Sequence, residues 1–254
     1  RTAFGHLQPG LQTGFCADTG GGWSAALVAH DSQLHDVPGT MSDEAAVLVE
    51  PTACAVHAAR AIGGRPMAVI GAGTLGLLTI AAVRTLGMAP GPLIATAKHP
   101  DQRRLAKDLG ADVIAAPDEL ERAVRSATRS FKAGTQLTAG VEVVVDCVGS
   151  DESMAQALSI VAPGGTVLLV GMPATVTLDM TGLWHREVCI KGSYAYTHDD
   201  FETAFDVVTE ARLERLLSST YTLDRYRDAI EHAAEAGRRG AVKIAFDLRK
   251  ERAR

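Results

Sequence analysis

The pattern of apolar and polar positions is most regular between residues 66 and 170, where short apolar runs alternate with longer amphipathic stretches. Five runs have the length and character of buried strands: Met67–Ile70, Leu93–Ala97, Val113–Ala115, Val141–Asp146 and Thr166–Val170. The stretches between them predict helices at Thr74–Leu86, Asp101–Leu109, Asp118–Phe131 and Glu152–Ile160. Strands and helices that alternate in this way form right-handed crossovers, so the pattern predicts an α/β fold with a doubly wound parallel sheet.

The flanking segments carry fewer signals. Upstream, the pattern predicts a strand at Trp23–Ala29, an N-cap at Ser42 and helical chain at Ala45–Ala61 with an interruption at Glu50-Pro51. Downstream, it predicts a strand at Val188–Tyr194, helices at Asp200–Glu210 and Leu223–Ala236, and a last strand at Val242–Asp247. The uncharged run Pro66–Val83 contains a glycine turn, so we interpret it as strand, turn and helix rather than as a membrane span.

Composition narrows the class of protein. The chain has 254 residues, 46% of them hydrophobic, and a net charge of −5. This length is enough for one large or two small globular domains. The sequence lacks the basic cluster expected of a protein that binds nucleic acid or an anionic membrane. The four cysteines are scattered, without metal-ligand or disulfide spacing, which favours a reducing, cytoplasmic location: Cys16, Cys54, Cys147 and Cys189.

The segment Gly71–Gly76 fits the pattern G-x-G-x-x-G between a predicted strand and a predicted helix. In that setting Gly71 permits the tight turn, Gly73 lets the backbone approach a pyrophosphate, and Gly76 allows close packing of helix on strand. The amides of Thr74 and Leu75 would meet the phosphates at the helix N-terminus. We therefore predict a dinucleotide site; the alternative is a glycine-rich turn without a ligand.

The end of the second strand indicates which dinucleotide fits. An NAD site places Asp or Glu there to bind the ribose 2′-hydroxyl, but this chain has Ala97, followed by Lys98 and, further on, Arg103 and Arg104. Charge-assisted hydrogen bonds to a 2′-phosphate contribute roughly 1.5–3 kcal/mol each, so the segment favours NADP over NAD. The alternative is that these cations form a solvated helix start.

Several segments occur in a familiar order: Gly21–Ser24, Glu50–Ala59, Gly71–Leu77, Leu109–Asp112, Asp146–Gly149, Val170–Pro173 and Lys191–Tyr194. Together they resemble the zinc-type alcohol dehydrogenases of the medium-chain dehydrogenase/reductase family, from residue 20 to residue 247. The resemblance implies three parts: residues 1–60, a remnant of a mostly β catalytic domain with the joining helix; residues 61–212, a Rossmann dinucleotide-binding domain; and residues 213–254, a return to the catalytic domain.

By this resemblance Glu50 occupies the position of the third protein ligand to the catalytic zinc, a role that a carboxylate suits. A Glu-Pro pair inside a helix is costly, which favours a functional role over a glutamate paired with a base. The family's two earlier ligands have no counterpart, since Gly5-His6-Leu7 lacks the expected Glu and Cys16 lacks the following glycines. We therefore expect that about a hundred residues of the complete enzyme precede this chain, and that zinc belongs to the complete protein.

The resemblance also assigns contacts at the two ends of the cofactor. Val148 resembles the apolar residue beside the adenine, and the residues at the nicotinamide end are Val170, Met172 and Ser193. Cys54 lies near the nicotinamide or is a packed small residue, and His57 is expected to be a partnered core histidine.

The expected function is hydride transfer between NADP(H) and an alcohol, aldehyde or ketone, with homo-oligomerisation by analogy. One alternative is a dinucleotide-binding module without catalysis. Another is a zinc-free quinone or enone reductase, against which Glu50 counts.

Overall fold

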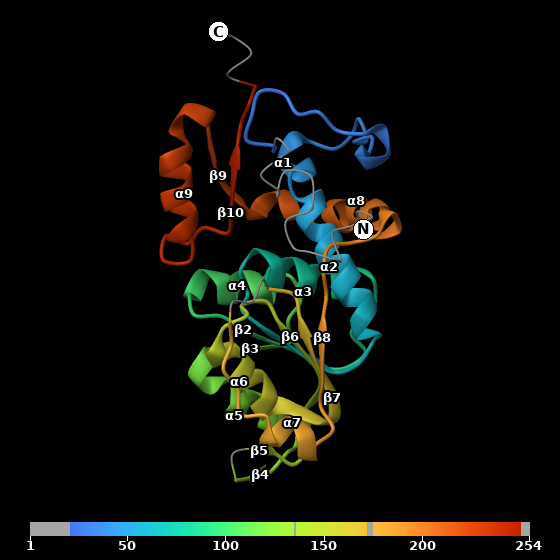
Figure 1. Ribbon diagram of the computed structural model, residues 1–254, viewed down its shortest axis with the longest axis vertical. Coiled ribbons are helices and arrows are strands. Elements are labelled where there is room, and N and C mark those ends of the chain that lie inside the picture. Colours follow the sequence, from blue (N-terminus) through green and yellow to red (C-terminus); the bar gives the residue numbers. More distant parts are fainter. Residues whose placement is uncertain (1–20, 135, 172–174, 250–254) are drawn as a thin grey trace. The chain divides into compact units, whose positions relative to one another are not determined.

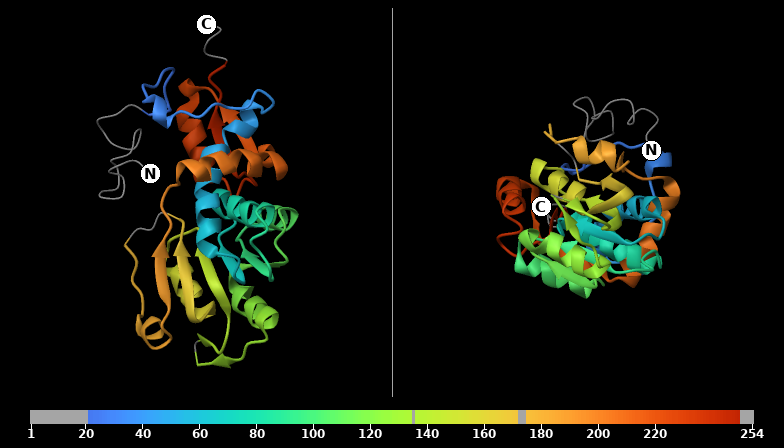
Figure 2. Two further views of the ribbon diagram at one scale, coloured as in Figure 1. Left: turned by 90° about the vertical axis from the view of Figure 1, so that its right-hand side faces the viewer. Right: turned by 90° about the horizontal axis from the view of Figure 1, so that it is seen from below.

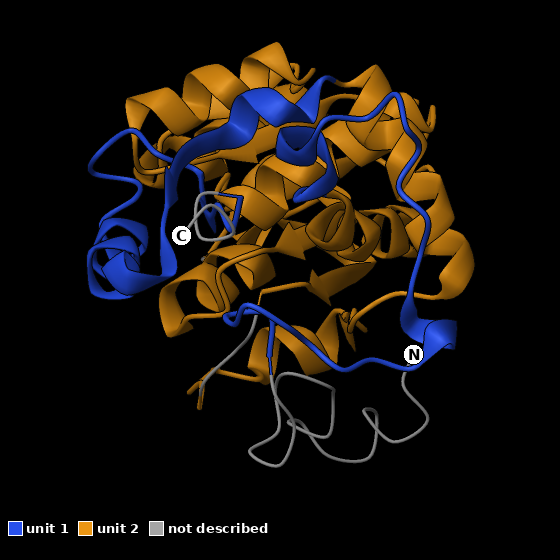
Figure 3. Cartoon of the chain, turned by 90° about the horizontal axis from the view of Figure 1, so that it is seen from above, with its two compact units in different colours: residues 1–48, 212–254 blue, residues 49–211 orange. Residues whose placement is uncertain are grey.

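The computed structural model describes residues 21–134, 136–171 and 175–249, and the chain forms two compact units (Figure 3). Unit 1 comprises Arg1–Leu48 together with Arg212–Arg254, and unit 2 comprises Val49–Ala211. The second division lies one residue from the boundary expected after residue 212. The first division, after Leu48, differs from the predicted boundary after residue 60, because the joining helix belongs to unit 2 and not to the first part. Unit 2 is one continuous segment of chain.

Unit 2 is built on a six-stranded sheet in the order β3-β2-β1-β6-β7-β8 (Figure 1). The strands are β1 Met67–Ile70, β2 Leu93–Thr96, β3 Val113–Ala115, β6 Val141–Asp146, β7 Val161–Leu169 and β8 Cys189–Gly192. All neighbouring pairs are parallel, so the strands point in one direction (Figure 2). The order reverses between β1 and β6, as in doubly wound nucleotide-binding folds, and the predicted α/β fold is confirmed.

Seven helices belong to the described part of unit 2: α2 Val49–Ile62, α3 Thr74–Thr85, α4 Pro100–Asp108, α5 Leu120–Thr128, α6 Asp151–Ile160, α7 Thr181–His185 and α8 His198–Glu210. Ala68 and Ile70 of β1 share a buried cluster with residues of α5 and α6. Val69, which faces the opposite side of the same strand, lies against α3 at Gly76. Helices therefore cover both faces of the sheet, which explains why its central strands are continuous apolar runs.

The helical chain before the sheet differs from the prediction. The expected interruption at Glu50-Pro51 is wrong, because α1 ends at Ala46 (Asp43–Ala46) and α2 begins at Val49. Pro51 therefore lies in the first turn of a helix, where its missing N–H removes no helical hydrogen bond. The expected cost of a mid-helix Glu-Pro pair therefore does not arise. The Glu50-Pro51 pair gives no support to a functional role for Glu50.

Unit 1 contains a two-stranded parallel sheet of β9 Leu217–Tyr221 and β10 Lys243–Phe246, with α9 Tyr226–Ala234 between them in sequence. The predicted strand at Trp23–Ala29 is wrong, because that segment has no strand pairing. Its Trp23 ring packs edge-on to Phe246, with centroids 5.0 Å apart. The described chain also contains the β4–β5 hairpin (Lys132–Ala133 and Gln136–Leu137) and the 3₁₀ turns Asp31–Gln33, Pro117–Glu119, Leu213–Leu216 and Leu223–Arg225. The second and fourth of these turns lie at the starts of predicted helices, and the pattern did not indicate the others.

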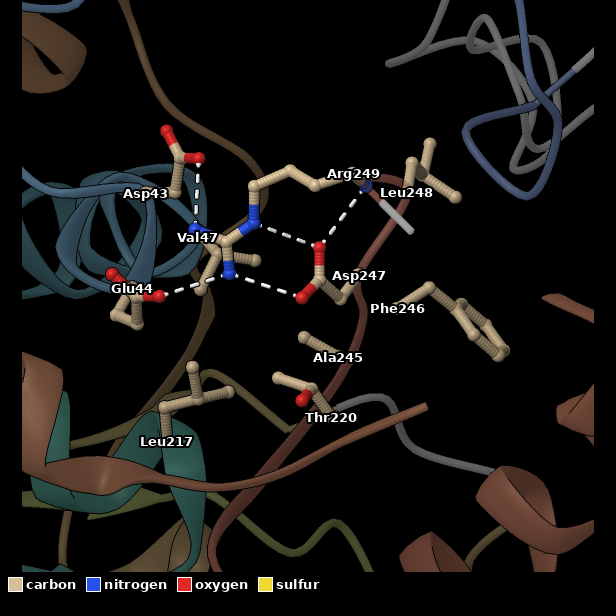
Figure 4. Close-up of a pocket in the computed structure, with 10 residues that line it drawn as sticks. All are labelled: Asp43, Glu44, Val47, Leu217, Thr220, Ala245, Phe246, Asp247, Leu248 and Arg249. Carbon is tan, nitrogen blue, oxygen red and sulfur yellow. Dashed lines mark hydrogen bonds and ion pairs between the residues drawn. The ribbon is translucent and has the colours of Figure 1, made fainter. Parts of the chain in front are cut away.

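The last described residue of unit 1, Arg249, lies between three carboxylates at the edge of a cavity of about 330 Å³ (Figure 4). Its guanidinium is 3.3 Å from Asp43, 3.1 Å from Glu44 and 2.8 Å from Asp247. This ion-pair group ties the end of the β10 segment to the first turn of α1, whose predicted N-cap Ser42 accepts the N–H of Ala45 at 3.2 Å. Among the described residues, every helix is too short or too polar to cross a membrane.

Candidate functional site

The carboxyl ends of the parallel strands meet at one edge of the unit 2 sheet, and main-chain hydrogen bonds bind the loops there to neighbouring strands. In each case a loop N–H donates to the carbonyl at the end of the adjacent strand. The bonds are Gly71 and Ala72 to Thr96 (both 3.0 Å), Cys147 to Ile70 (3.0 Å), Val170 and Gly171 to Asp146 (2.9 and 3.0 Å), and Ser193 to Leu169 (2.8 Å). This edge, at the point where the strand order reverses, is where open α/β sheets bind ligands.

The structure brings the expected cofactor residues to this edge. Those on its loops are Gly71, Gly73, Ala97, Lys98, Val148, Val170 and Ser193, and those in the first turn of α3 are Thr74, Leu75 and Gly76. Arg103 lies one turn into α4, beside the loop after β2. Met172 lies outside the described residues, as do His6 and Cys16.

The three glycines of the loop after β1 have different surroundings. Gly71 has φ +88°, and a Cβ there would collide with the side chain of Val148. A Cβ on Gly76 would overlap the carbonyl oxygen of Gly71. Gly73 has an ordinary φ of −78°, and a Cβ there would have no atom within 4 Å. Packing thus explains the first and third glycines, whereas the second borders open space that a ligand can enter.

Helix α3 starts at that open space with an N-cap residue that has no side chain of its own. Its N-cap is Gly73, and the first turn carries no acidic residue. N–H groups at a helix start, together with the positive end of the helix dipole, favour an anion. The absence of a competing carboxylate in this turn of α3 leaves the position suited to a diphosphate.

The loop after β2 presents positive charge and no carboxylate at the position that selects the cofactor. Ala97 is buried and Lys98 is exposed. Arg103 donates its Nη1–H to the carbonyl oxygens of Ala97 at 2.8 Å and Lys98 at 3.0 Å, which fixes the shape of the loop. Arg104 instead lies near Asp101 and Asp108 of its own helix, so it is not part of this group.

Asp146, at the end of β6, is a residue of the site that sequence reasoning missed. It is 0% exposed, and its carboxylate accepts the N–H groups of Val148 at 2.8 Å and Gly149 at 3.1 Å and the hydroxyl of Ser153 at 2.8 Å. The one available signal was an acidic residue that ends a purely apolar strand. The next residue, Cys147, is half-buried, and burial of its thiol raises its pKa to about 12.

A second polar group lies along one face of α2, where Glu50, Cys54 and His57 follow one another at helical spacing. Glu50 is exposed in the first turn and lies near Tyr196 of the loop before α8. Burial and the Glu50 carboxylate raise the pKa of Cys54 to about 12, so its thiol stays neutral. Burial and the same carboxylate also raise the pKa of Tyr196 above its usual range.

His57 has the partner expected of a core histidine. Its Nδ1–H donates to Asp200 at 2.8 Å, and Arg60 donates to the other oxygen of that carboxylate at 2.5 Å. Asp200 also accepts the N–H and the hydroxyl of Thr197, both at 2.8 Å, at the start of α8. Burial alone would raise the pKa of Asp200, but hydrogen bonds from Thr197 and His57 outweigh it and hold the pKa below its usual value.

Comparisons with known proteins agree with this geometry. Residues 74–210 match the family model described as zinc-binding dehydrogenase. Curated relatives include L-idonate 5-dehydrogenase of Vitis vinifera, 30% identical over 233 residues, and sorbitol dehydrogenase of Arabidopsis thaliana, 30% identical over 234 residues. Each of these alignments covers 88% of this chain and 62% of the relative, so the chain spans less than two thirds of the relatives' length.

Solved structures show the same fold. A protein of Sinorhizobium meliloti 1021 described as a zinc-binding dehydrogenase bound to NADP is 27% identical, with a TM-score of 0.68. That comparison covers 84% of this chain and 62% of the other. Alcohol dehydrogenase TADH of Thermus sp. ATN1 has a TM-score of 0.73 at 23% identity, and the comparison covers 91% of this chain and 68% of the other.

Proposed function

The chain belongs to the zinc-binding dehydrogenase family, and from this premise we propose that it binds NADP(H) for hydride transfer between that cofactor and an alcohol or carbonyl compound. The observation that carries the proposal is the open space at Gly73, the glycine N-cap that precedes the first turn of α3. The named relatives act on idonate and sorbitol, which favours a polyol or its keto form as the substrate.

The cofactor's diphosphate lies against the N–H groups of Thr74, Leu75 and Gly76 in this proposal. Gly73 admits it because no Cβ fills the space in front of the backbone. Val148, which is 47% exposed beside Gly71, offers an apolar surface to the adenine. The nicotinamide end is assigned to Val170, Met172 and Ser193, the residues that follow β7 and β8.

NADP is favoured over NAD because the loop after β2 offers cations where an NAD site offers a carboxylate. Ala97 cannot repel a 2′-phosphate, and Lys98 is exposed beside it. Arg103 uses Nη1 to hold the loop, and a guanidinium has five N–H donors, so others remain for the phosphate. The NADP bound to the S. meliloti relative supports the same cofactor class.

Glu50 is the residue of this chain that we propose as a zinc ligand in the complete protein. Its carboxylate is exposed near Tyr196, and a carboxylate has about four acceptor positions with which it can bind a metal. An oxygen donor of this kind fits zinc. When bound, zinc polarises the substrate oxygen.

Titration of the purified chain with NADPH and NADH, followed by fluorescence, tests the cofactor proposal. We expect NADPH to bind, and Gly73→Ala to weaken it by about tenfold or more, because its methyl group enters the phosphate space. Gly39→Ala is the matched control, since its Cβ also meets no atom within 4 Å. Failure of both cofactors to bind overturns the proposal. Binding without turnover of polyols supports the alternative of a dinucleotide-binding module.

We further propose that β8 mediates a homo-oligomer. It is the last strand of the sheet, its Cys189 and Lys191 are exposed, and Trp184 and Tyr194 on either side of it are exposed as well. Unpaired strand edges and exposed aromatic side chains are typical of subunit contacts. Light scattering at micromolar concentration should give the mass of at least a dimer, and a monomer mass contradicts this proposal.

A further inference from the structure

Asp146 is a buried carboxylate at the proposed cofactor edge that none of the proposed cofactor contacts uses. Burying a carboxylate is costly unless hydrogen bonds satisfy its oxygens. Two of its three donors are the main-chain N–H groups of Val148 and Gly149, which belong to the loop directly after Asp146. Gly149 has φ +77°. The carboxylate therefore turns the chain back on itself as soon as β6 ends, and it fixes the path of this loop.

The main chain of Asp146 binds a second loop. Its carbonyl oxygen accepts the N–H groups of Val170 at 2.9 Å and Gly171 at 3.0 Å, directly after β7. A Cβ on Gly171 would lie 2.6 Å from the carbonyl carbon of Cys147, so the two loops pack backbone against backbone. The loop after β7, which we assign to the nicotinamide end, thus depends on the loop that the Asp146 carboxylate holds.

Val148 connects Asp146 to the glycine loop. The carboxylate holds the Val148 N–H, and the Val148 side chain lies so close to Gly71 that only a glycine fits there. A shift of Val148 therefore changes both its own exposed surface and the contact that confines Gly71. Through these contacts one residue sets the positions of three loops, after β1, β6 and β7.

We propose that Asp146 is a positioning residue of the NADPH site: it places the Val148 and Val170 loops against the glycine loop without touching the cofactor. This inference rests on the proposed function. Binding sites need their contacting groups held within a fraction of an ångström, and hydrogen bonds from outside the contact layer supply that constraint. Truncation of Asp146 should therefore lower cofactor affinity in protein that is still folded.

Asp146→Ala and Asp146→Asn, with Ser153→Ala as control, test the inference by NADPH titration. Alanine removes the acceptor for both loop amides, and we expect affinity to fall by about tenfold to a hundredfold. Asparagine keeps one accepting oxygen for the loop and an NH₂ group that can donate to Ser153, so we expect a loss of about twofold to fivefold. Ser153→Ala removes the α6 donor to Asp146 and the side chain that accepts the Ser150 N–H at the start of α6, but it leaves both loop amides bonded to Asp146 and should leave affinity unchanged.

Circular dichroism and the melting temperature separate positioning from stability. A merely structural role lowers the melting temperature of Asp146→Ala while its folded fraction binds NADPH as the wild type does, and that result overturns the inference. If Asp146→Ala does not fold, amide hydrogen exchange in Asp146→Asn decides: faster exchange at Val148 and Gly149 with weaker binding supports the inference, and unchanged exchange and binding overturn it. A wild-type chain that binds no NADPH defeats the proposed function instead.

Discussion

The buried carboxylate of Asp200 allows a stability prediction that the structure makes quantitative. Asp200 is 1% exposed and accepts four hydrogen bonds at 2.5–2.8 Å: two from Thr197 and one each from His57 and Arg60. The bonds from His57 and Arg60 join α2 to α8, elements that are more than 130 residues apart in sequence. Asp200→Ala removes all four bonds and leaves the donors of α2 without their acceptor.

The expected loss is about 4 kcal/mol in the free energy of unfolding. Removing one partner of a buried ion pair costs about 3–5 kcal/mol, and the loss of a helix-start bond adds about 1 kcal/mol. The low end applies because the Arg60 side chain is 40% exposed and water can solvate its guanidinium once Asp200 is gone. Against a total stability of about 5–15 kcal/mol, such a loss is large.

Urea unfolding followed by circular dichroism measures this loss. Asp206→Ala, at an exposed position of the same helix, is the matched control and should change stability by no more than about 0.5 kcal/mol. Asp200→Asn should fall between the two, since its amide keeps one accepting oxygen. A loss below about 1 kcal/mol for Asp200→Ala would show that the four bonds do not join the helices as described.

The pH dependence gives a second measurement of the same group. Because the pKa of Asp200 is held below its usual value in the folded chain, the unfolded chain takes up the proton first as the pH falls. The contribution of Asp200 is therefore complete above the unfolded pKa of about 3.9, and it is lost as the pH falls through the lower folded pKa. Stability of the wild type should decline in this acid range more steeply than that of Asp200→Asn, and equal slopes would contradict the assignment.

Three further predictions concern single residues of unit 2. Lys98→Ala should weaken NADPH by about tenfold to a hundredfold and leave NADH nearly unchanged in parallel titrations, because it removes one charge-assisted bond to the 2′-phosphate; an equal effect on both cofactors contradicts the NADP preference. Gly76→Ala should lower the free energy of unfolding by about 1–3 kcal/mol in urea, because its methyl group overlaps the Gly71 carbonyl, whereas Gly73→Ala should not. Arg186 is buried and donates to three main-chain carbonyl oxygens at 2.7–3.2 Å. Arg186→Met should therefore lower the free energy of unfolding by about 2–4 kcal/mol in urea. A loss under about 1 kcal/mol would mean that water replaces the guanidinium as the donor to these oxygens.

The central sheet was predictable because helices bury its strands on both faces. Three strands, β1, β3 and β6, have the predicted bounds, and the others differ by a few residues. Unit 1 was harder to predict because its strands are not continuous apolar runs. The strand β9 has the sequence LSSTY and alternates between less and more exposed positions. Trp23–Ala29 has the composition of a strand but no pairing partner, and its Val28 is 94% exposed.

In the candidate site, features made by residues adjacent in sequence could be predicted, and contacts between residues far apart in sequence could not. The glycine loop could be predicted because turn, helix start and strand end are adjacent in sequence. The pairing of His57 with Asp200 spans 143 residues, and no local pattern indicates it. Asp146 stood among the landmarks of the family resemblance, yet its role depends on three loops meeting at one edge. The assignments of individual residues to the cofactor and to zinc remain predictions.

The division of the chain has a consequence for how it is synthesised. Unit 2 is one uninterrupted segment and holds all of its strands once Ala211 has left the ribosome. Unit 1 is assembled from both ends: Arg249 closes onto Asp43 and Glu44 from more than 200 positions later. The early segment must therefore wait, without its final partners, until Arg249 has been synthesised. The intervening segment can fold first and hold the two ends nearer together, which lowers the entropy cost of that late closure.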